Sequence, residues 1–415
     1  MKNKDNLLPI VLVIGIFFPT SQGGIISPSL MWLKVAIFLT TALYLIVKNG
    51  KINVIFLTSL FLMVAILLIS TFFTSLTGYA FGTFGFYISY FLMFCLSLRN
   101  IAVTNKTLKF FSVINVLIVA IGILTVMDFK FIDDFILKYY TSHKPHLVPQ
   151  MLFANKPVIT FGSHSIASLF IFLLFFTCFR LSVATKRKSY TIFFVAYLFL
   201  LYSMKSNSGY LYLMIGVAYL LVYAVTHLKP KLLIISTLIF GIFIGVFSSQ
   251  ITSFLTEAIT SFRQSLMSQQ NGILGRFGDS GVLQVNIDYI KQNLFRPIGF
   301  GYDTLLTYTD SGFIEYVLRG SIFFAILIYL SLFLFLRKNI KSKLSALVVF
   351  SAIMMFDVTA YPIYKESTIF YLLPFMIVIL NNFDSVTKKV KQPVTKEIIP
   401  EHPPLERILA QKEAI

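Results

Sequence analysis

Four arginine residues are crowded into one stretch of the chain, where their side chains could act together. A planar guanidinium group binds phosphate oxygens through two parallel hydrogen bonds and keeps its charge near a membrane. Fixed cations of this kind can stabilise a leaving group that gains negative charge. The pattern therefore favours the chemistry of a phosphate ester. The residues are Arg263, Arg276, Arg296 and Arg319.

Three of these arginines also have a plainer structural interpretation. Arg276 could pair with Asp279 in its own glycine-rich turn. Arg263 lies in an amphipathic segment, and we expect its side chain to reach lipid phosphates. Arg296 would end a short helix, where a cation stabilises the helix dipole. Both kinds of interpretation stay open for Arg276 and Arg296.

Acidic residues accompany the last arginine at the start of a membrane helix expected over 311–336. Asp310 could accept a proton from an attacking hydroxyl group or orient a sugar. It could equally cap the helix, a role that Ser311 would share. Glu315 precedes Arg319 by one helical turn, so these two could form an ion pair. Ions inside a membrane edge are usually functional or paired.

The elements that must position these residues are membrane helices. Apolar residues make up 57% of the chain and charged residues 13%, whereas soluble domains carry about 25% charged residues. Such a chain can cover a surface that faces lipid. We predict an all-α integral membrane protein, with 1–384 as a single bundle of about twelve transmembrane helices. The apolar runs are 7–20, 29–47, 52–73, 79–98, 110–127, 164–181, 190–204, 208–226, 231–248, 311–336, 344–360 and 367–384.

The distribution of positive charge predicts the topology. Lys and Arg follow the second, fourth, sixth, eighth, tenth and twelfth runs, and the five connections between runs in this set lack Asp and Glu. Cytoplasmic loops are enriched in Lys and Arg, so we expect both termini inside and 385–415 as a flexible cytoplasmic tail. The net charge of +18 is thereby explained without a nucleic-acid partner.

Two connections on the outer side are long, at 128–163 and 249–310. Apolar residues recur with helical spacing in both, over 131–140 and 251–266. We therefore expect amphipathic helices that lie on the outer interface or the mouth of the bundle. Long ordered connections are uncommon without a function, so these segments are the expected location of the site.

Further candidate residues lie elsewhere. Lys205 could supply a cation in an outer turn, and His164 stands at the end of the first long connection. Lys34 and Asp357 are single charges within apolar runs, and we expect both in the bundle interior. Neither the histidines nor the buried free thiols expected at Cys95 and Cys178 predict a metal or another cofactor.

The stretch between Arg276 and Gly320 resembles the second large periplasmic loop of Wzy-type O-antigen polymerases, within the O-antigen ligase and polymerase superfamily. The resemblance rests on an arginine, a short helix, a Pro-x-Gly-x-Gly turn at 297–301, and a helix that begins Ser-Gly-Phe-Ile-Glu-Tyr at 311–316. An Asp at position 310, where ligases carry a His, is similar to the polymerase side. The Ser-Gly pair at 208–209 lacks the arginine of the Ser-Arg-Gly-like motif that opens a membrane helix in the superfamily.

The resemblance implies a GT-C-class glycosyltransferase without a metal cofactor in the bacterial inner membrane. Its partners would be an undecaprenyl-pyrophosphate-linked glycan donor and acceptor, membrane lipid and a chain-length regulator protein. Catalytic roles fall to Arg276 and Asp310. Pyrophosphate binding falls to Arg263, Arg276, Arg296, Arg319 and Lys205. Glycan binding falls to His164, Asp303 and Glu315.

Two other functions stay open from the sequence. An O-antigen ligase would transfer a finished glycan to another acceptor, although the Asp at 310 disfavours it. A flippase for lipid-linked oligosaccharides would suit the number of helices. That class usually has short loops and charges that line an intramembrane cavity, whereas the polar residues of this chain gather outside.

Overall fold

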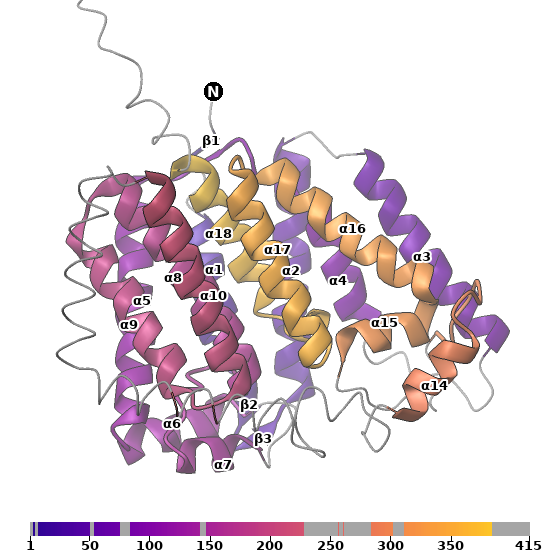
Figure 1. The fold of residues 1–415 in the computed structure, drawn as a ribbon. Coiled ribbons are helices and arrows are strands. Elements are labelled where there is room, and N and C mark those ends of the chain that lie inside the picture. The colour runs from indigo at the N-terminus through magenta and orange to yellow at the C-terminus, as the bar shows by residue number, and fades with distance from the viewer. Residues whose placement is uncertain are drawn as a thin grey trace, which may run out of the picture.

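The chain folds into a bundle of helices, as the computed structural model shows for residues 3–4, 7–49, 54–74, 84–141, 147–227, 256, 260, 284–301 and 311–383 (Figure 1). The helices in the first half are α1 (Leu7–Phe17), α2 (Pro28–Asn49), α3 (Val54–Thr74), α4 (Phe84–Phe94), α5 (Asn105–Val126), α6 (Lys130–Tyr139), α7 (Leu147–Phe153), α8 (His164–Thr185), α9 (Lys188–Ser203) and α10 (Asn207–His227). Those in the second half are α14 (Gln284–Gln292), α15 (Gly312–Gly320), α16 (Ile322–Asn339), α17 (Lys343–Thr359), the 3₁₀ turn η2 (Ile363–Lys365) and α18 (Ile369–Phe383).

Membrane-spanning length and composition are found in six helices of the described part: α2, α3, α5, α8, α10 and α16. Three shorter apolar helices are α4, α9 and α18. Every predicted apolar run contains a helix except 231–248, which lies outside the described residues, as does the tail 385–415. The all-α membrane fold is thus confirmed, while the count of twelve spans is not reached by the helices described.

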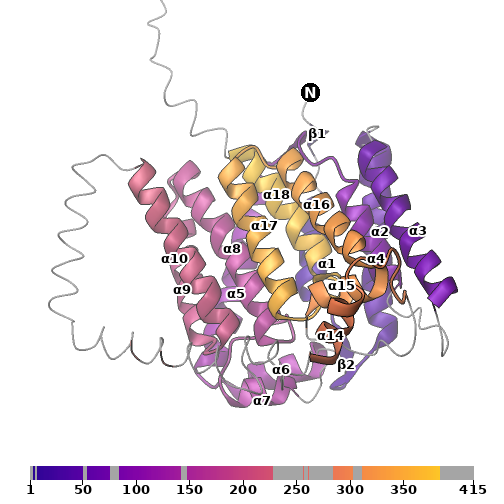
Figure 2. The same cartoon turned by 45° about the vertical axis from the view of Figure 1, so that its right-hand side comes forward.

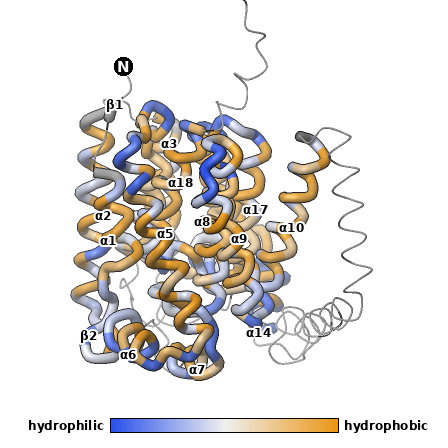
Figure 3. The backbone as a smooth tube through the Cα atoms, turned by 90° about the vertical axis from the view of Figure 1, so that its left-hand side faces the viewer, coloured by the Kyte–Doolittle hydropathy of each residue, from blue (hydrophilic) through white to orange (hydrophobic). Residues whose placement is uncertain are grey.

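The outer surface of these helices is suited to contact with lipid, because it exposes large apolar side chains. Val113 in α5, Ile192 in α9 and Leu221 in α10 are all more than half exposed. A soluble monomer rarely exposes contiguous apolar patches of this extent. Figure 3 shows largely hydrophobic helix shafts with hydrophilic stretches toward the ends of the bundle.

The two ends of the bundle are built differently. The basic turns between α8 and α9 and between α16 and α17 lie at the end marked by β1 (Asn3–Lys4) (Figure 1). There β1 pairs in parallel with β4 (Ile101–Ala102). The opposite end carries α6, α7 and the antiparallel pair of β2 (Ser21–Gln22) and β3 (Ile25–Ile26), and α14 lies toward it in both views (Figures 1 and 2). The predicted gathering of these basic turns on one side is therefore present.

The first long connection contains the predicted amphipathic helix, α6, and a second helix, α7. Ile136 of α6 and Tyr140, which follows the helix, are buried against Val148, Met151 and other apolar residues. Phe131, at the start of α6, is 75% exposed. The helix predicted over 251–266 lies outside the described residues, apart from positions 256 and 260.

The predicted helix over 311–336 is broken. Its first part, α15, ends at Gly320, and α16 begins at Ile322. Between them Ser321 has φ +87°, a conformation that right-handed helices exclude. In Figure 1, α15 lies across the bundle, whereas α16 continues along it. Gly320 and Ser321 stand at the break, and the apolar residues on either side of them led to the prediction of one helix.

Candidate active site at the broken helix

Residues 293–301 form a turn that closes α14. The backbone N–H of Asn293 donates to Tyr289 O at 3.0 Å, and that of Arg296 donates to Asn293 O at 3.0 Å. Pro297 follows, and proline cannot continue a helix because its nitrogen lacks a hydrogen. Ile287, Tyr289 and Ile290 pack α14 against α15. The predicted short helix and the Pro-x-Gly-x-Gly turn are both confirmed.

This turn docks on the end of α15. The N–H groups of Phe300 and Gly301 donate to the carbonyl oxygens of Leu318 and Arg319, both at 2.7 Å. The last carbonyls of a helix lack partners within it, so the turn supplies them at the break. The approach requires glycine, since a Cβ atom on Gly299 would lie 2.4 Å from Leu318 O. The motif read from the sequence is therefore a clamp on the broken helix.

A buried ion network holds α15 from the opposite side. Arg319 Nε donates to Glu315 Oε1 at 2.8 Å, and Lys365 Nζ contacts Glu315 Oε2 at 2.8 Å. The hydroxyl of Tyr364 also donates to Glu315. Arg319 Nη1 donates to Gly301 O at 2.9 Å, which links the network to the turn. Glu315 and Arg319 are only 3% and 6% exposed, so the ion pair foreseen from their spacing is present.

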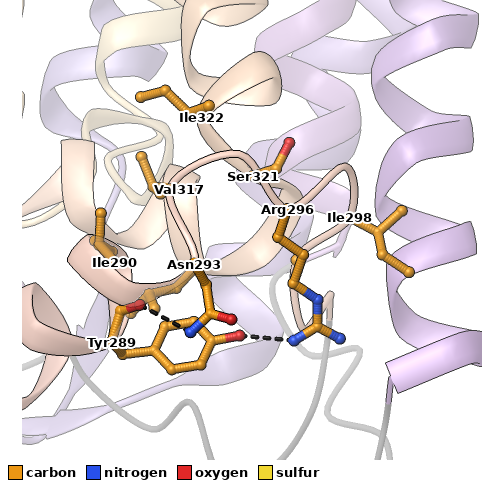
Figure 4. A pocket seen from close by; sticks show the side chains of 10 residues that line it. Tyr289, Ile290, Asn293, Arg296, Ile298, Val317, Ser321 and Ile322 are labelled. Carbon is orange, nitrogen blue, oxygen red and sulfur yellow. Dashed lines mark hydrogen bonds between the residues drawn. The ribbon is translucent and has the colours of Figure 1, made fainter.

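Arg296 is placed differently from Arg319. Its Nη1 donates to the Tyr289 hydroxyl at 2.7 Å, and its guanidinium carbon lies 5.4 Å from the centre of the Phe300 ring. Among the described residues no carboxylate forms an ion pair with it. It borders a small cavity of about 10 Å³ that Asn293, Ser321 and neighbouring apolar residues line (Figure 4). Within the described part of the chain, one donor of this guanidinium is used by a side chain, and the others are available to an anion.

The start of α15 is fixed against α17. Ser311 is the N-cap and accepts from Ile314 N at 3.5 Å, and Gly312 N donates to Ala360 O at 2.9 Å. Asp357 lies beneath them, fully buried, and accepts from Ile363 N at 2.7 Å and from the Tyr316 hydroxyl at 3.2 Å. Asp357 thus lies in the interior, as expected, with backbone and hydroxyl groups as its partners.

The other predicted residues are distributed as follows. His164 is the first residue of α8, and Lys205 is an exposed residue with φ +43° in the turn between α9 and α10. Ser208 Oγ donates to Ser165 Oγ at 3.2 Å, which brings these helix ends together on elements other than α14 and α15. Four predicted residues lie outside the described part of the chain: Arg263, Arg276, Asp303 and Asp310.

Sequence reasoning missed Lys365 and Tyr364. A signal existed, because Lys365 and Glu366 are adjacent charges between two apolar runs on the predicted outer side. Charges in that place usually have a partner or a function. Their connection to Glu315 needed the fold, since the contacting residues are 50 positions apart.

The arrangement can bind an anion and hold it rigidly. Arg296 offers the free donors, and the clamp and the ion network fix the backbone that carries it. Within the described residues no group of three His, Cys, Asp or Glu side chains could hold a metal ion. No protein-family model, curated protein or solved structure matches the chain.

Proposed function

We propose that the chain is a glycosyltransferase that polymerises oligosaccharide repeat units carried on undecaprenyl pyrophosphate. It would act at the outer face of the bacterial inner membrane, with both chain termini in the cytoplasm. The products would be an O-antigen, a capsule or an exopolysaccharide. The observation that carries the proposal is a partly exposed arginine, Arg296, on a turn that is clamped to a broken, ion-paired helix.

The proposed reaction joins two lipid-linked glycans. A hydroxyl oxygen of the acceptor bonds to the anomeric carbon of the donor, and the bond from that carbon to the diphosphate oxygen breaks. The electron pair leaves with undecaprenyl pyrophosphate, and the hydroxyl proton passes to a base, for which we propose Asp310. Arg276 and Arg296 would neutralise the charge that develops on the diphosphate.

Arg319 takes a positioning role in this proposal. Its guanidinium is buried and occupied by Glu315 and Gly301 O. Isolated charges in a low-dielectric interior are costly, so such a pair persists only where its geometry is well satisfied. We assign Glu315 and Arg319 the task of holding the turn, and Arg296 the contact with phosphate.

Polysaccharide from a deletion strain tests the function. The strain should lack long polymer while single repeat units are still capped onto their acceptor. Complementation with Arg296→Gln should reduce long polymer by about tenfold or more, as expected when a charged donor to phosphate is lost. Arg337→Gln, at the opposite end of α16, is the matched control and should restore wild-type polymer.

Other outcomes would assign the chain to another class. Accumulation of lipid-linked units on the cytoplasmic face would identify a flippase. Loss of all capped product, with long chains still on undecaprenyl pyrophosphate, would identify a ligase. A deletion strain with wild-type polymer would refute all three functions.

A further inference from the structure

A second cavity, of about 40 Å³, lies apart from Arg296. Its walls come from four places: the turn after α1, the start of α2, the residues on either side of α7, and the segment between η2 and α18. A space of this size holds a few water molecules or one polar substituent of a larger ligand. No residue predicted to bind substrate from the sequence lines it, so it is a separate site.

Lys34 provides the charge that lines this cavity. Its side chain is 2% exposed, and its ammonium donates to Thr368 Oγ1 at 2.9 Å. An ammonium has three donors, and within the described residues this is the one hydrogen bond formed by Nζ. The ring centre of Tyr371 lies 6.0 Å away. A buried cation with donors to spare favours a ligand that brings acceptor oxygens.

Thr160 provides an unused hydroxyl group among the residues that line this cavity. The residue is 7% exposed, and among the described residues Oγ1 has no hydrogen-bond partner. The preceding residue, Ile159, has φ +53°, a left-handed conformation that is strained for a β-branched residue. A turn bond from Phe161 N to Val158 O, at 3.0 Å, stabilises this backbone. The strained turn therefore carries a hydroxyl group, that of Thr160, which forms no hydrogen bond within the described fold.

The remaining polar groups decide what kind of ligand fits. Glu366 lines the cavity and accepts from the Tyr361 hydroxyl, while Lys365 also lines it but is paired with Glu315. Lys34 and Glu366 therefore leave the cavity close to neutral. It offers donors and an acceptor together, beside the rings of Tyr140 and Phe161. A sugar presents hydroxyl groups that both donate and accept, and an apolar face that aromatic rings can contact.

We propose that this cavity binds the hydroxyl-bearing edge of a sugar through Lys34, Thr160 and Glu366. The inference rests on the proposed function, because it makes the cavity a subsite for the glycan part of a lipid-linked substrate. It lies between elements from both halves of the chain, so a sugar bound there would be held by the bundle itself.

Thr160→Val is the decisive variant, since it replaces a hydroxyl with a methyl group of similar size. The hydroxyl forms no bond within the described fold, so the melting temperature of the purified full chain should not fall. Long polymer in the complemented deletion strain should fall about tenfold, the loss expected for one hydrogen bond to substrate. The control is Thr177→Val in α8, where the hydroxyl donates to its own helix at Leu173 O, 2.8 Å away. It should leave polymer unchanged.

The outcomes separate the two proposals. If Thr160→Val supports wild-type polymer at equal protein level while Arg296→Gln does not, the sugar subsite is refuted and the function stands. If the deletion strain keeps its polymer, the function itself fails. Thermal shift of the purified chain with inorganic pyrophosphate is the second measurement. A rise in melting temperature that Lys34→Met abolishes would make the cavity an oxyanion site and overturn the sugar proposal.

Discussion

Two helices of the molecule, α8 and α15, satisfy their polar groups in opposite ways. In α8 every residue from Ile166 to Phe179 is buried, and none of these carries a charge. Its ends are capped locally, by Ser163 Oγ at the start and by a bond from Lys186 N to Ser182 O at the end. In α15 a glutamate and an arginine are buried within nine residues, and a distant turn caps the last carbonyls.

This difference between α8 and α15 distinguishes a structural helix from the helix of the candidate site. A continuous helix satisfies its backbone internally, which is what hydrocarbon demands. A broken helix is tolerated only where other protein groups supply the missing partners. The 297–301 turn and η2 supply hydrogen-bond partners to α15, and Ser70 Oγ of α3 accepts in turn from Gly299 N of the turn, so several elements are committed to one short helix. Support of one short helix by several elements is expected where side chains must be held in a fixed geometry, as in an active site.

Removing the acid of α15 should have the largest effect on stability. Glu315→Gln leaves the buried cation of Arg319 and the partly buried cation of Lys365 without their common carboxylate. Breaking a buried ion pair from one side costs about 3 to 5 kcal/mol. In α8, Ser168→Ala removes a bond to His164 O within the same helix and should cost under about 1 kcal/mol. Thermal unfolding in detergent compares the two, and equal losses would remove the distinction between the helices.

The second-largest effect on stability is expected when alanine replaces a glycine of the clamp. In Gly299→Ala the new carbon would lie 2.4 Å from a backbone oxygen, and because backbone cannot yield easily we expect a loss of about 3 kcal/mol. Gly216→Ala in α10 is the counterpart, where the nearest atom is a ring carbon of Phe175 at 3.1 Å. Alanine is favoured over glycine by about 1 kcal/mol in a helix interior. The free energy of unfolding of Gly216→Ala should therefore stay within about 1 kcal/mol of the wild-type value. A tolerated Gly299→Ala would mean that the clamp is loose.

Arg296→Gln should change stability by less than about 1 kcal/mol, because the side chain is partly exposed and makes one hydrogen bond within the described residues. The same variant is expected to lose polymer, which distinguishes a binding residue from a structural one. Melting temperature and polymer length measured on one strain give the comparison. A large fall in melting temperature would assign Arg296 to the clamp rather than to phosphate.

The smallest effect on stability is expected at Asp133, an acid that, unlike Glu315, has no ion-pair partner among the described residues. Burial, with Asp128 and Asp134 adding to it, raises the pKa of Asp133 in α6 to about 6. The folded state disfavours the ionised form of Asp133. The contribution of the protonated side chain to the stability of the fold is therefore present below about pH 4 and is lost as pH rises through 6. Asp133→Asn should therefore raise the melting temperature by about 1 °C at pH 7 and leave it unchanged at pH 4. A pH-independent effect would contradict this assignment.

Much of the fold follows from the sequence. Apolar runs located helices throughout the described part, and the basic residues at the α8–α9 and α16–α17 turns share one end of the bundle. The spacing of Glu315 and Arg319 predicted their ion pair, because residues four apart share a helical face. The Pro-x-Gly-x-Gly motif marked the turn, since only small residues allow backbone to approach backbone.

The remaining features depend on contacts distant in sequence. The break at Ser321 lies within a run that the sequence predicts as one helix, because apolar residues flank the Arg-Gly-Ser stretch at 319–321 on both sides. Lys365 reaches Glu315 only because η2 folds beside α15. The cavity at Lys34 needs residues from both ends of the chain. Hydropathy and spacing report local structure, so they could place these residues in the bundle but not beside one another.

The bond between Lys34 and Thr368 has a consequence for how the protein is made. These residues stand 334 positions apart, and Thr368 in turn donates to Gly15 O in α1 at 3.1 Å. The Lys34 ammonium group in α2 therefore lacks this partner until residue 368 has been synthesised. The contact that joins α1, α2 and the residue before α18 is thus one of high contact order. A chain truncated before η2 would leave Lys34 without its Thr368 partner.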